Sequence, residues 1–172
     1  MMQHTDSQET RPNIIVLPAT ENDSTDIWKW CNDEQTKKIS MTTDDVNWET
    51  HGRWYSKSLL NPNHYWYVGF LNGDEKMGMC RFEVDPITNI ADVSINLNPD
   101  HRNKRLSTTL LSQSIATFLT ERPTNLRARI KKTNIGSMTC FLRIGFMFER
   151  YDNGINYYTY SVPPIKLIES PI

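Results

Sequence analysis

The spacing of apolar residues changes twice between positions 90 and 132, and this change constrains the fold more than any other feature. The segment opens with four apolar residues that alternate with polar ones, the two-residue period of a half-buried strand: Ala91, Val93, Ile95 and Leu97. A helical period follows, with Leu106, Leu110, Leu111, Ile115, Phe118 and Leu119. Alternation then returns, with Leu126, Ala128 and Ile130 opposite Arg127, Arg129 and Lys131. The segment therefore predicts a β-α-β crossover.

Shorter runs and turn signals predict the remaining elements. Asn72-Gly73 is typical of a tight hairpin turn between two strands. We expect strands at 13–17, 65–71, 76–84, 90–97, 126–132, 146–151 and 156–162. We expect helices at 24–38, 44–60, 106–119 and 135–143. Ser24 or Asp23 is expected to cap the first helix, Thr43 the second, and Gly145 ends the last. The order β-α-α-β-β-β-α-β-α-β-β is of the α+β class.

Length and composition indicate one folded domain. The chain has 172 residues, of which 38% are apolar and 10% aromatic, which is sufficient for a single hydrophobic core. No repeat or composition break divides it. We expect one domain over residues 13–165, between a flexible N-terminal tail at 1–12 and a C-terminal tail at 166–172.

Several classes of protein are disfavoured by the same composition. No apolar run approaches the roughly 20 residues that span a bilayer, and residues 1–12 lack the apolar core of a signal peptide. The three cysteines are far apart and form no Cys-x-x-Cys pair, which favours free thiols over disulfides or a zinc site. A net charge of −1 argues against general nucleic-acid binding. We therefore expect a cytoplasmic protein with no metal and no nucleic-acid or membrane partner.

A basic loop joins the predicted strand at 90–97 to the helix that follows. Residues 98–132 hold eight basic side chains against Asp100 and Glu121. A helix N-terminus presents unpaired N–H groups at the positive end of its dipole, which suits a phosphate or pyrophosphate. The alternative is a solvated surface loop. Three cations would surround the anion: Arg102, Lys104 and Arg105.

The element order, this loop and the later Asn134…Gly145-Phe146 segment resemble the GNAT-type N-acetyltransferases. In that family a loop of pattern Arg/Gln-x-x-Gly-x-Gly/Ala wraps the coenzyme A pyrophosphate. The stretch from Arg102 to Ser107 matches in its leading Arg, but Arg105 replaces the first glycine and Ser107 the second. The resemblance implies a mostly antiparallel sheet of about seven strands, with about four helices packed on both faces.

The resemblance also implies a site for acetyl-CoA as co-substrate. The end of the crossover strand, Ile95, Asn96 and Leu97, would bind the pantetheine arm through backbone groups. The loop residues would bind the pyrophosphate: Arg102, Asn103, Lys104, Arg105, Leu106 and Ser107. Asn134 matches a coenzyme-contacting asparagine of the family, with Ser137 one turn later, although Asn134 also suits a plain helix N-cap.

Acetyl transfer to an amine requires a base and a route for protonation of the leaving thiolate. Asp92, on the polar face of the crossover strand, is the first candidate base, and Glu83 is the second. His51 and His101 are further candidates, and His101 is expected on the surface. The family commonly has a tyrosine acid four residues before its Gly-Phe pair, where this chain has Phe141. A phenylalanine cannot donate a proton.

The amino-terminal half resembles a GNAT subgroup that acetylates nucleotide-linked amino sugars for pseudaminic acid and related surface polysaccharides. The resemblance rests on Trp30-Cys31-Asn32-Asp33, on His51-Gly52-Arg53-Trp54 and on Gly78-Met79-Cys80-Arg81-Phe82. Arg81 is able to pair with a nucleotide phosphate, and Trp54 or Trp66 to stack on a ring; His51 is a pocket residue or a core histidine. We therefore predict substrate contacts from His51, Trp54 and Arg81.

The leading prediction is an N-acetyltransferase acting on a nucleotide-linked amino sugar by direct attack in a ternary complex, as a possible homodimer. One alternative is a GNAT enzyme acting on a protein N-terminus or a small amine. Another is a degenerate, non-catalytic acyl-CoA-binding protein, which Arg105 and Phe141 favour.

Overall fold

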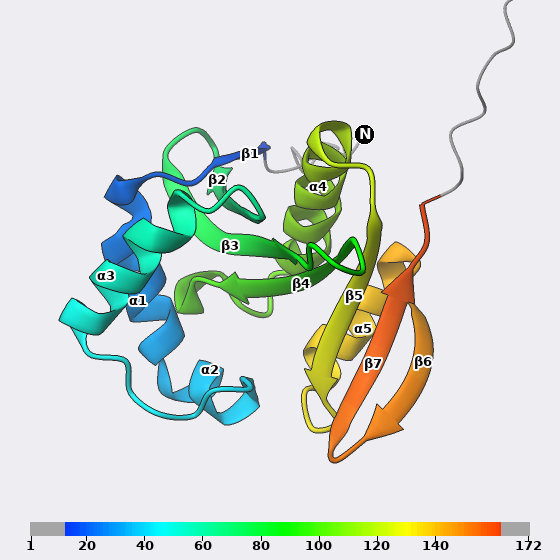
Figure 1. Cartoon of the computed structure of the whole chain (residues 1–172). Coiled ribbons are helices and arrows are strands. Elements are labelled where there is room, and N and C mark those ends of the chain that lie inside the picture. The colour runs from blue at the N-terminus through cyan, green and yellow to red at the C-terminus, as the bar shows by residue number, and fades with distance from the viewer. Residues whose placement is uncertain (1–12, 163–172) are drawn as a thin grey trace, which may run out of the picture.

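The computed structural model of the protein describes residues 13–162. The expected tails at 1–12 and 166–172, and the end of the expected domain at 163–165, lie outside the described residues. The described chain forms one seven-stranded sheet in the order β1-β2-β3-β4-β5-β7-β6 (Figure 1). The strands are β1 (Ile14–Pro18), β2 (His64–Leu71), β3 (Glu75–Val84), β4 (Ile90–Leu97), β5 (Asn125–Lys131), β6 (Met147–Asp152) and β7 (Ile155–Tyr160).

All neighbouring strands are antiparallel except β4 and β5, which are parallel. The crossover between those two strands is α4 (Leu106–Glu121). The predicted mixed, mostly antiparallel α+β sheet and its β-α-β unit are thus confirmed. The hairpin between β2 and β3 turns at Asn72 and Gly73, which have φ angles of 52° and 111°. Both lie in the left-handed region, which Asn and Gly tolerate best.

The described residues form five α-helices, where about four were expected. They are α1 (Ser24–Asn32), α2 (Glu34–Ile39), α3 (Trp48–Leu59), α4 and α5 (Ile135–Ile144), with short 3₁₀ turns at Glu21–Asp23 and Pro99–His101. The extra helix arises because the predicted 24–38 helix breaks at Asp33. The Asp33 side chain accepts a hydrogen bond from the Thr36 N–H at 2.9 Å and so caps a new helix, α2.

The next helix, α3, begins at Trp48 and not at Asp44, and its cap is Asn47 and not Thr43. The reason is tertiary. The Asn32 carboxamide binds both main-chain groups of Val46, each at 2.9 Å, and the Trp28 indole N–H donates to the Val46 carbonyl at 2.6 Å. Because these groups are occupied by α1, residue 46 cannot supply them to a helix. The prediction of a helix from residue 44, which would have included Val46, was therefore wrong at its start.

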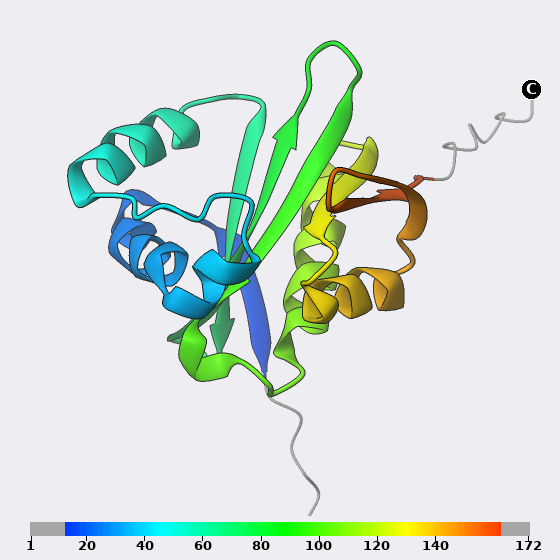
Figure 2. The ribbon, with the colours of Figure 1, turned by 90° about the horizontal axis from the view of Figure 1, so that it is seen from below.

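Two layers of helices cover the two faces of the sheet (Figure 2). The α4 and α5 layer buries the larger core, which includes Phe82, Phe118, Ala128 and Phe146. On the opposite face, α1 and α3 pack on β2 and β3 around a smaller aromatic cluster: Ile27, Trp30, Tyr55, Trp66, Val68 and Met79. The two-residue period of β4 and β5 is therefore reproduced, with apolar residues toward α4 and polar residues toward the other face.

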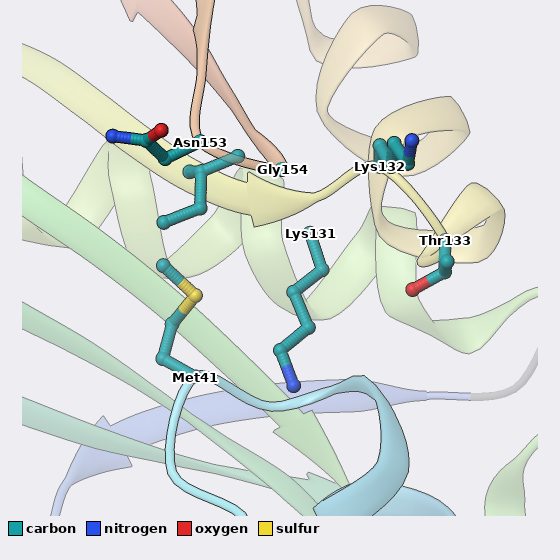
Figure 3. Close-up of a pocket in the computed structure, with 7 residues that line it drawn as sticks. Met41, Lys131, Lys132, Thr133, Asn153 and Gly154 are labelled. Atoms are coloured by element: carbon teal, nitrogen blue, oxygen red, sulfur yellow. The ribbon is translucent and has the colours of Figure 1, made fainter.

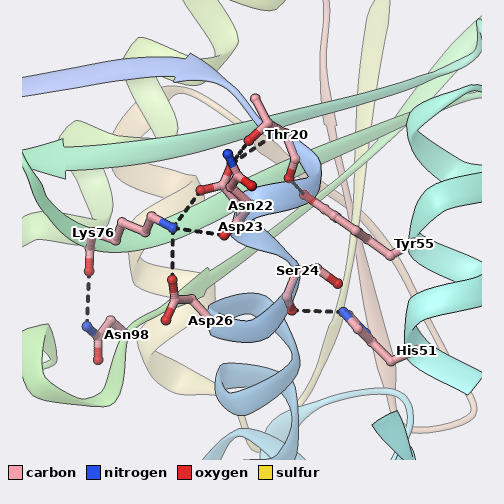
Figure 4. A network of polar contacts seen from close by, with 9 residues as sticks. All are labelled: Thr20, Asn22, Asp23, Ser24, Asp26, His51, Tyr55, Lys76 and Asn98. Atoms are coloured by element: carbon pink, nitrogen blue, oxygen red, sulfur yellow. Dashed lines mark hydrogen bonds and ion pairs between the residues drawn. The ribbon is translucent and has the colours of Figure 1, made fainter. Parts of the chain in front are cut away.

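A polar network fixes the start of α1 to β3 (Figure 4). Lys76 Nζ lies 2.8 Å from an Asp23 carboxylate oxygen and 2.9 Å from one of Asp26. Burial alone would lower the pKa of Lys76, but the two carboxylates outweigh it and raise that pKa. The Asn98 carboxamide donates to the Lys76 carbonyl at 3.0 Å. The network therefore links the first helix to the residue that precedes the basic loop.

Within residues 13–162, none of the helices combines the length and apolar character required to cross a membrane.

Replacing Asn32 by alanine tests the contact that shortens α3. The change removes two hydrogen bonds to Val46 and leaves its part-buried N–H unpaired, whereas the carbonyl keeps its bond from Trp28, so the free energy of unfolding should fall by about 2 kcal/mol. Urea denaturation measures this change. Asn22→Ala, at an exposed side chain, is the control and should stay within about 0.5 kcal/mol of the parent. Equal losses in the two variants would contradict the assignment.

Candidate functional site

The parallel strands β4 and β5 diverge after a short paired stretch. Only Ile90–Asp92 of β4 pairs with residues 125–127 of β5. Beyond that point β4 remains paired with β3 as far as Leu97, and β5 with β7 as far as Lys131. One edge of β4, from Val93 to Leu97, therefore has no strand partner on the β5 side. We call this wedge between the strands the β4/β5 opening.

An ion pair stands at the closed end of the β4/β5 opening. Arg127 donates from Nε to one Asp92 oxygen at 2.6 Å and from a terminal nitrogen to the other at 2.9 Å. A terminal nitrogen of Arg129 lies 3.5 Å from Asp92. The hydrogen bond to Asp92 raises the pKa of Arg127. Both oxygens of Asp92, the first candidate base, thus already accept bonds from a guanidinium group.

The tip of β4 is held close to β3. A Cβ at Gly78 would lie 2.6 Å from the Asn96 carbonyl oxygen and 2.9 Å from Leu97 Cα, so only glycine fits there. Ile95 and Leu97 lean toward the α4 layer. Asn96 points the other way, where its Oδ1 accepts from the Thr36 hydroxyl at 3.3 Å. The predicted pantetheine-binding residues therefore lie on the open edge, fixed from behind by β3.

The basic loop before α4 has the backbone geometry that glycine usually supplies. Asn103 and Arg105 have φ angles of 60° and 59°, in the left-handed region. For a non-glycine residue this conformation costs about 1 kcal/mol. No side chain caps the N-terminus of α4, no acidic residue lies in its first turn, and Lys104 and Arg105 are exposed. Among residues 13–162, the first-turn N–H groups and these two cations therefore have no anionic partner, despite the two missing glycines.

Arg102, the leading residue of the loop motif, is directed elsewhere. Its guanidinium lies 2.6 Å from an Asp33 carboxylate oxygen, donates to the Thr36 hydroxyl at 2.6 Å and reaches Gln35 at 3.3 Å. Burial alone would raise the pKa of Asp33, but the Thr36 N–H and the Arg102 guanidinium outweigh it and hold that pKa below its ordinary value. Arg102 therefore fastens the loop to α2.

Asn134 is the N-cap of α5, as one of its two interpretations expected. Its Oδ1 accepts from the Ser137 N–H at 3.1 Å. Both residues are half-buried at the end of α5 that follows β5. Capping explains why an asparagine stands there, and the coenzyme contact of Asn134 and Ser137 stays a prediction.

Arg81 occupies an aromatic setting on the face of the sheet that carries α3. Its guanidinium carbon lies 5.4 Å from the ring centre of Trp54 and 5.1 Å from that of Trp66, which suits cation–π contacts. Glu83 approaches Arg81 Nε at 3.5 Å. Trp66 is buried and donates its indole N–H to Ser58, whereas 40% of Trp54 is exposed. Trp54 is thus the accessible ring of the pair.

The two histidines are both buried. His51 stacks on Tyr55, and its Nε2 bonds the Ser24 carbonyl at 3.0 Å, as Figure 4 shows. Burial lowers the pKa of His51, so its ring is neutral at pH 7. His51 is only 2% exposed, and its contact with the substrate stays a prediction. His101 was expected on the surface, which was wrong: it is 2% exposed, because the 3₁₀ turn at Pro99–His101 folds its ring against the protein.

Position 141 contributes no acid. Phe141 is buried and packs edge-on against Phe146, with ring centres 4.9 Å apart. Cys80 and Cys140 lie in the same core, and burial raises the pKa of the Cys80 thiol. Across residues 13–162, no group of three or more His, Cys, Asp or Glu side chains is arranged to hold a metal ion.

A pocket of about 350 Å³ lies where the loop after α2 meets the ends of β5 and the β6–β7 turn (Figure 3). Its lining residues are Met41, Lys131, Lys132, Thr133, Asn153, Gly154 and Ile155. Lys131 reaches from β5 toward the loop that carries Met41. This pocket could not be predicted from local sequence patterns, because its walls come from three distant segments.

Three comparisons bear on this geometry. Residues 13–147 match the Acetyltransferase (GNAT) domain family, and no match was found among curated proteins. A spermidine N-acetyltransferase from Vibrio cholerae, solved with CoA and spermine, has a TM-score of 0.77 at 14% identity, over 86% of this chain and 94% of that one.

Two further solved structures are similar. RimL, a ribosomal L7/L12 alpha-N-protein acetyltransferase solved with coenzyme A, gives a TM-score of 0.72 at 14% identity, over 87% of this chain and 94% of its own. The protein yncA of Salmonella typhimurium, solved with its cofactor acetyl-CoA, has a TM-score of 0.71 at 18% identity, over 86% of this chain and 93% of its own. At such identities these likenesses establish the fold.

The match over residues 13–147 covers most of the chain, so the protein belongs to the GNAT acetyltransferase family. The family predicted from the element order and the basic loop is thus confirmed. The descriptions of the three structures named above do not mention nucleotide sugars, and the nucleotide-sugar subgroup stays a prediction.

Asp33→Asn tests the pair that fastens the loop to α2. At pH 7 the variant should lose about 1 kcal/mol of unfolding free energy, since Asn keeps the cap but not the charge. The pKa of Asp33 is depressed in the folded state, so its contribution is present above the unfolded value of about 3.9 and is lost as the pH falls through the lower folded pKa.

Urea denaturation between pH 2 and pH 7 should therefore show the parent and Asp33→Asn converging at low pH. Asp45→Asn, which removes the exposed partner of Lys37, is the control and should have little effect at any pH. A difference for Asp33→Asn that does not depend on pH would rule out the ion pair as its cause.

Proposed function

We propose that the protein transfers an acetyl group from acetyl-CoA to a primary amine, in the GNAT manner, within a ternary complex. The observation that carries the proposal is the β4/β5 opening, with an unpaired β4 edge and a free, basic α4 N-terminus at its mouth. Pantetheine amides bind well to an unpaired strand edge, and a pyrophosphate to a helix N-terminus. The similar structures solved with CoA or acetyl-CoA support this choice of co-substrate.

In the proposed complex, backbone groups of Ile95, Asn96 and Leu97 bind the pantetheine arm. The pyrophosphate lies against the loop from Asn103 to Ser107 at the start of α4. Arg102 contributes by holding this loop to α2, because its guanidinium is paired with Asp33. Asn134 and Ser137 border the coenzyme from the start of α5. No side chain of the protein needs to form a covalent intermediate.

In the proposed reaction the amine nitrogen attacks the thioester carbonyl, a C–N bond forms, and the C–S bond breaks. The amine proton passes to a carboxylate, and the departing thiolate takes a proton from water, since Phe141 has none to donate. Glu83 is favoured as base over Asp92, because within residues 13–162 its carboxylate approaches only Arg81, at 3.5 Å, whereas Asp92 accepts bonds on both oxygens. Asp92 then acts by positioning Arg127.

We further propose that the acceptor is a nucleotide-linked amino sugar. Arg81 and the exposed face of Trp54 border the acceptor side, and His51 supports Trp54 from beneath with their ring centres 6.1 Å apart. The similar structures include enzymes for spermidine and for a protein N-terminus, so amines of those kinds are the competing acceptors. The three free cysteines favour a reducing compartment, which agrees with a cytoplasmic enzyme.

The proposal also includes a homodimer, since β6 is an edge strand whose Met147, Phe148 and Tyr151 are exposed.

Acetyl-CoA binding is the first test. At about 100 times its dissociation constant, acetyl-CoA should stabilise the protein by about 2.7 kcal/mol and raise the melting temperature by roughly 5 °C or more. Thiol release should then follow when a nucleotide-linked amino sugar is added. An unchanged melting temperature would reject the coenzyme site. Binding without thiol release from any of the three acceptor classes would instead indicate a non-catalytic acyl-CoA-binding protein.

Glu83→Gln and Asp92→Asn separate the two carboxylates. Glu83→Gln should lower kcat by roughly 100-fold or more while the KM for acetyl-CoA stays unchanged, because only proton transfer is lost. Asp92→Asn should lower the melting temperature, since Arg127 loses its partner, and should leave most of kcat. The reverse pattern in steady-state kinetics would assign the base to Asp92.

A further inference from the structure

Cationic side chains gather on one face of the carboxyl-terminal strands. Arg127, Arg129 and Lys131 alternate along β5 and point to the same side. On β6, Arg150 lies over the Tyr157 ring at 3.6 Å, and Tyr157 is the register partner of Arg129. We call Arg127, Arg129, Lys131 and Arg150 the basic wall.

The basic wall borders the side of the β4/β5 opening that faces α1 and α2. Arg127 meets Asp92 on the polar face of β4, and Asn96 of that face contacts Thr36 of α2. The helices α1, α2 and α3 cover β2 to β4 only, and no described helix lies over this face of β5, β7 and β6 (Figure 1). The wall is therefore open toward the place where an acceptor would approach the coenzyme.

Most of the positive charge on the wall is not neutralised. Asp92 forms its close ion pair with Arg127, at 2.6 Å. Its distance to Arg129 is longer, 3.5 Å, and the Arg129 side chain is 46% exposed. Asp152 lies 3.8 Å from Arg150. Within residues 13–162, no carboxylate oxygen lies within 4 Å of Lys131 Nζ, and the pocket that Lys131 lines contains no acidic residue. Three cations thus remain available to a ligand.

The spacing of these cations selects the shape of the anion. Alternate residues of a strand are about 6.6 Å apart, so Arg129 and Lys131 suit an extended group with charges at two points better than a single carboxylate. Guanidinium groups bind phosphate oxygens in pairs, and lysine adds a point charge. A cationic polyamine would be repelled by the same surface.

We propose that the basic wall and the pocket beside Lys131 form a subsite for the diphosphate of the acceptor, distinct from the pyrophosphate site at α4. In this subsite the diphosphate contacts Arg129, Lys131 and Arg150. It does not contact Arg81, because Trp54, Trp66 and Glu83 already surround that guanidinium. This inference rests on the proposed function, because it assumes that the acceptor enters beside the β4/β5 opening.

Binding of uridine diphosphate to the CoA-saturated protein tests the subsite without requiring turnover. Saturating CoA occupies the α4 N-terminus, so further binding measured by calorimetry reports a second anion site. Lys131→Ala and Arg129→Ala should each weaken uridine diphosphate binding by about tenfold, the effect of one charge-assisted hydrogen bond. Lys131→Arg should keep most of the affinity, and Lys29→Ala, on the exposed side of α1, should change nothing.

The outcomes are distinct. Absence of uridine diphosphate binding, or binding that Lys131→Ala and Arg129→Ala leave unchanged, would overturn the subsite. Binding to the free protein that CoA abolishes would also overturn it, since the anion would then occupy the α4 site. If CoA itself does not bind, the proposed function fails, yet uridine diphosphate binding that depends on Lys131 would still support the subsite.

Discussion

The parallel pairing of β4 and β5 ends at Asp92 and Arg127, which form an ion pair there, and the rest of the site depends on where this pairing stops. A parallel pair that continued to Leu97 would consume the β4 edge in strand pairing and leave no room for a coenzyme. The bidentate ion pair joins β4 and β5 at the end where they are paired. At the other end β4 follows β3 and β5 follows β7, so the two strands diverge. The same contact occupies a carboxylate that would otherwise be the natural base.

The proposed coenzyme and acceptor sides are joined by a short chain of polar contacts. Arg102 of the loop pairs with Asp33 and Thr36 of α2, and Thr36 donates to Asn96 at the tip of β4. The Asn96 carboxamide in turn lies 3.9 Å from the Cys31 thiol of α1. A displacement of α2 therefore moves both the loop and the strand edge, so acceptor and coenzyme sites share one support.

The fold alone does not define the acceptor. A similar backbone carries an enzyme that its description assigns to spermidine and one assigned to a ribosomal protein, each at 14% identity. Side chains on the strand faces determine whether the site binds a cationic or an anionic acceptor. Here β5 presents three cations, where a polyamine would require carboxylates. We therefore infer the acceptor from the charge of the wall rather than from the likeness of the fold.

The sequence by itself determined the order of the strands, the crossover and the family, because apolar periodicity and turn residues are local signals. It also located the basic loop before α4. Only the tertiary structure decided the start of α3, where Asn32 takes the main chain of Val46, and the partners of Arg102 and Asp92. Those partners are 69 and 35 residues away in the chain, and no local pattern reports which charged side chains the folded sheet and helices bring within bonding distance.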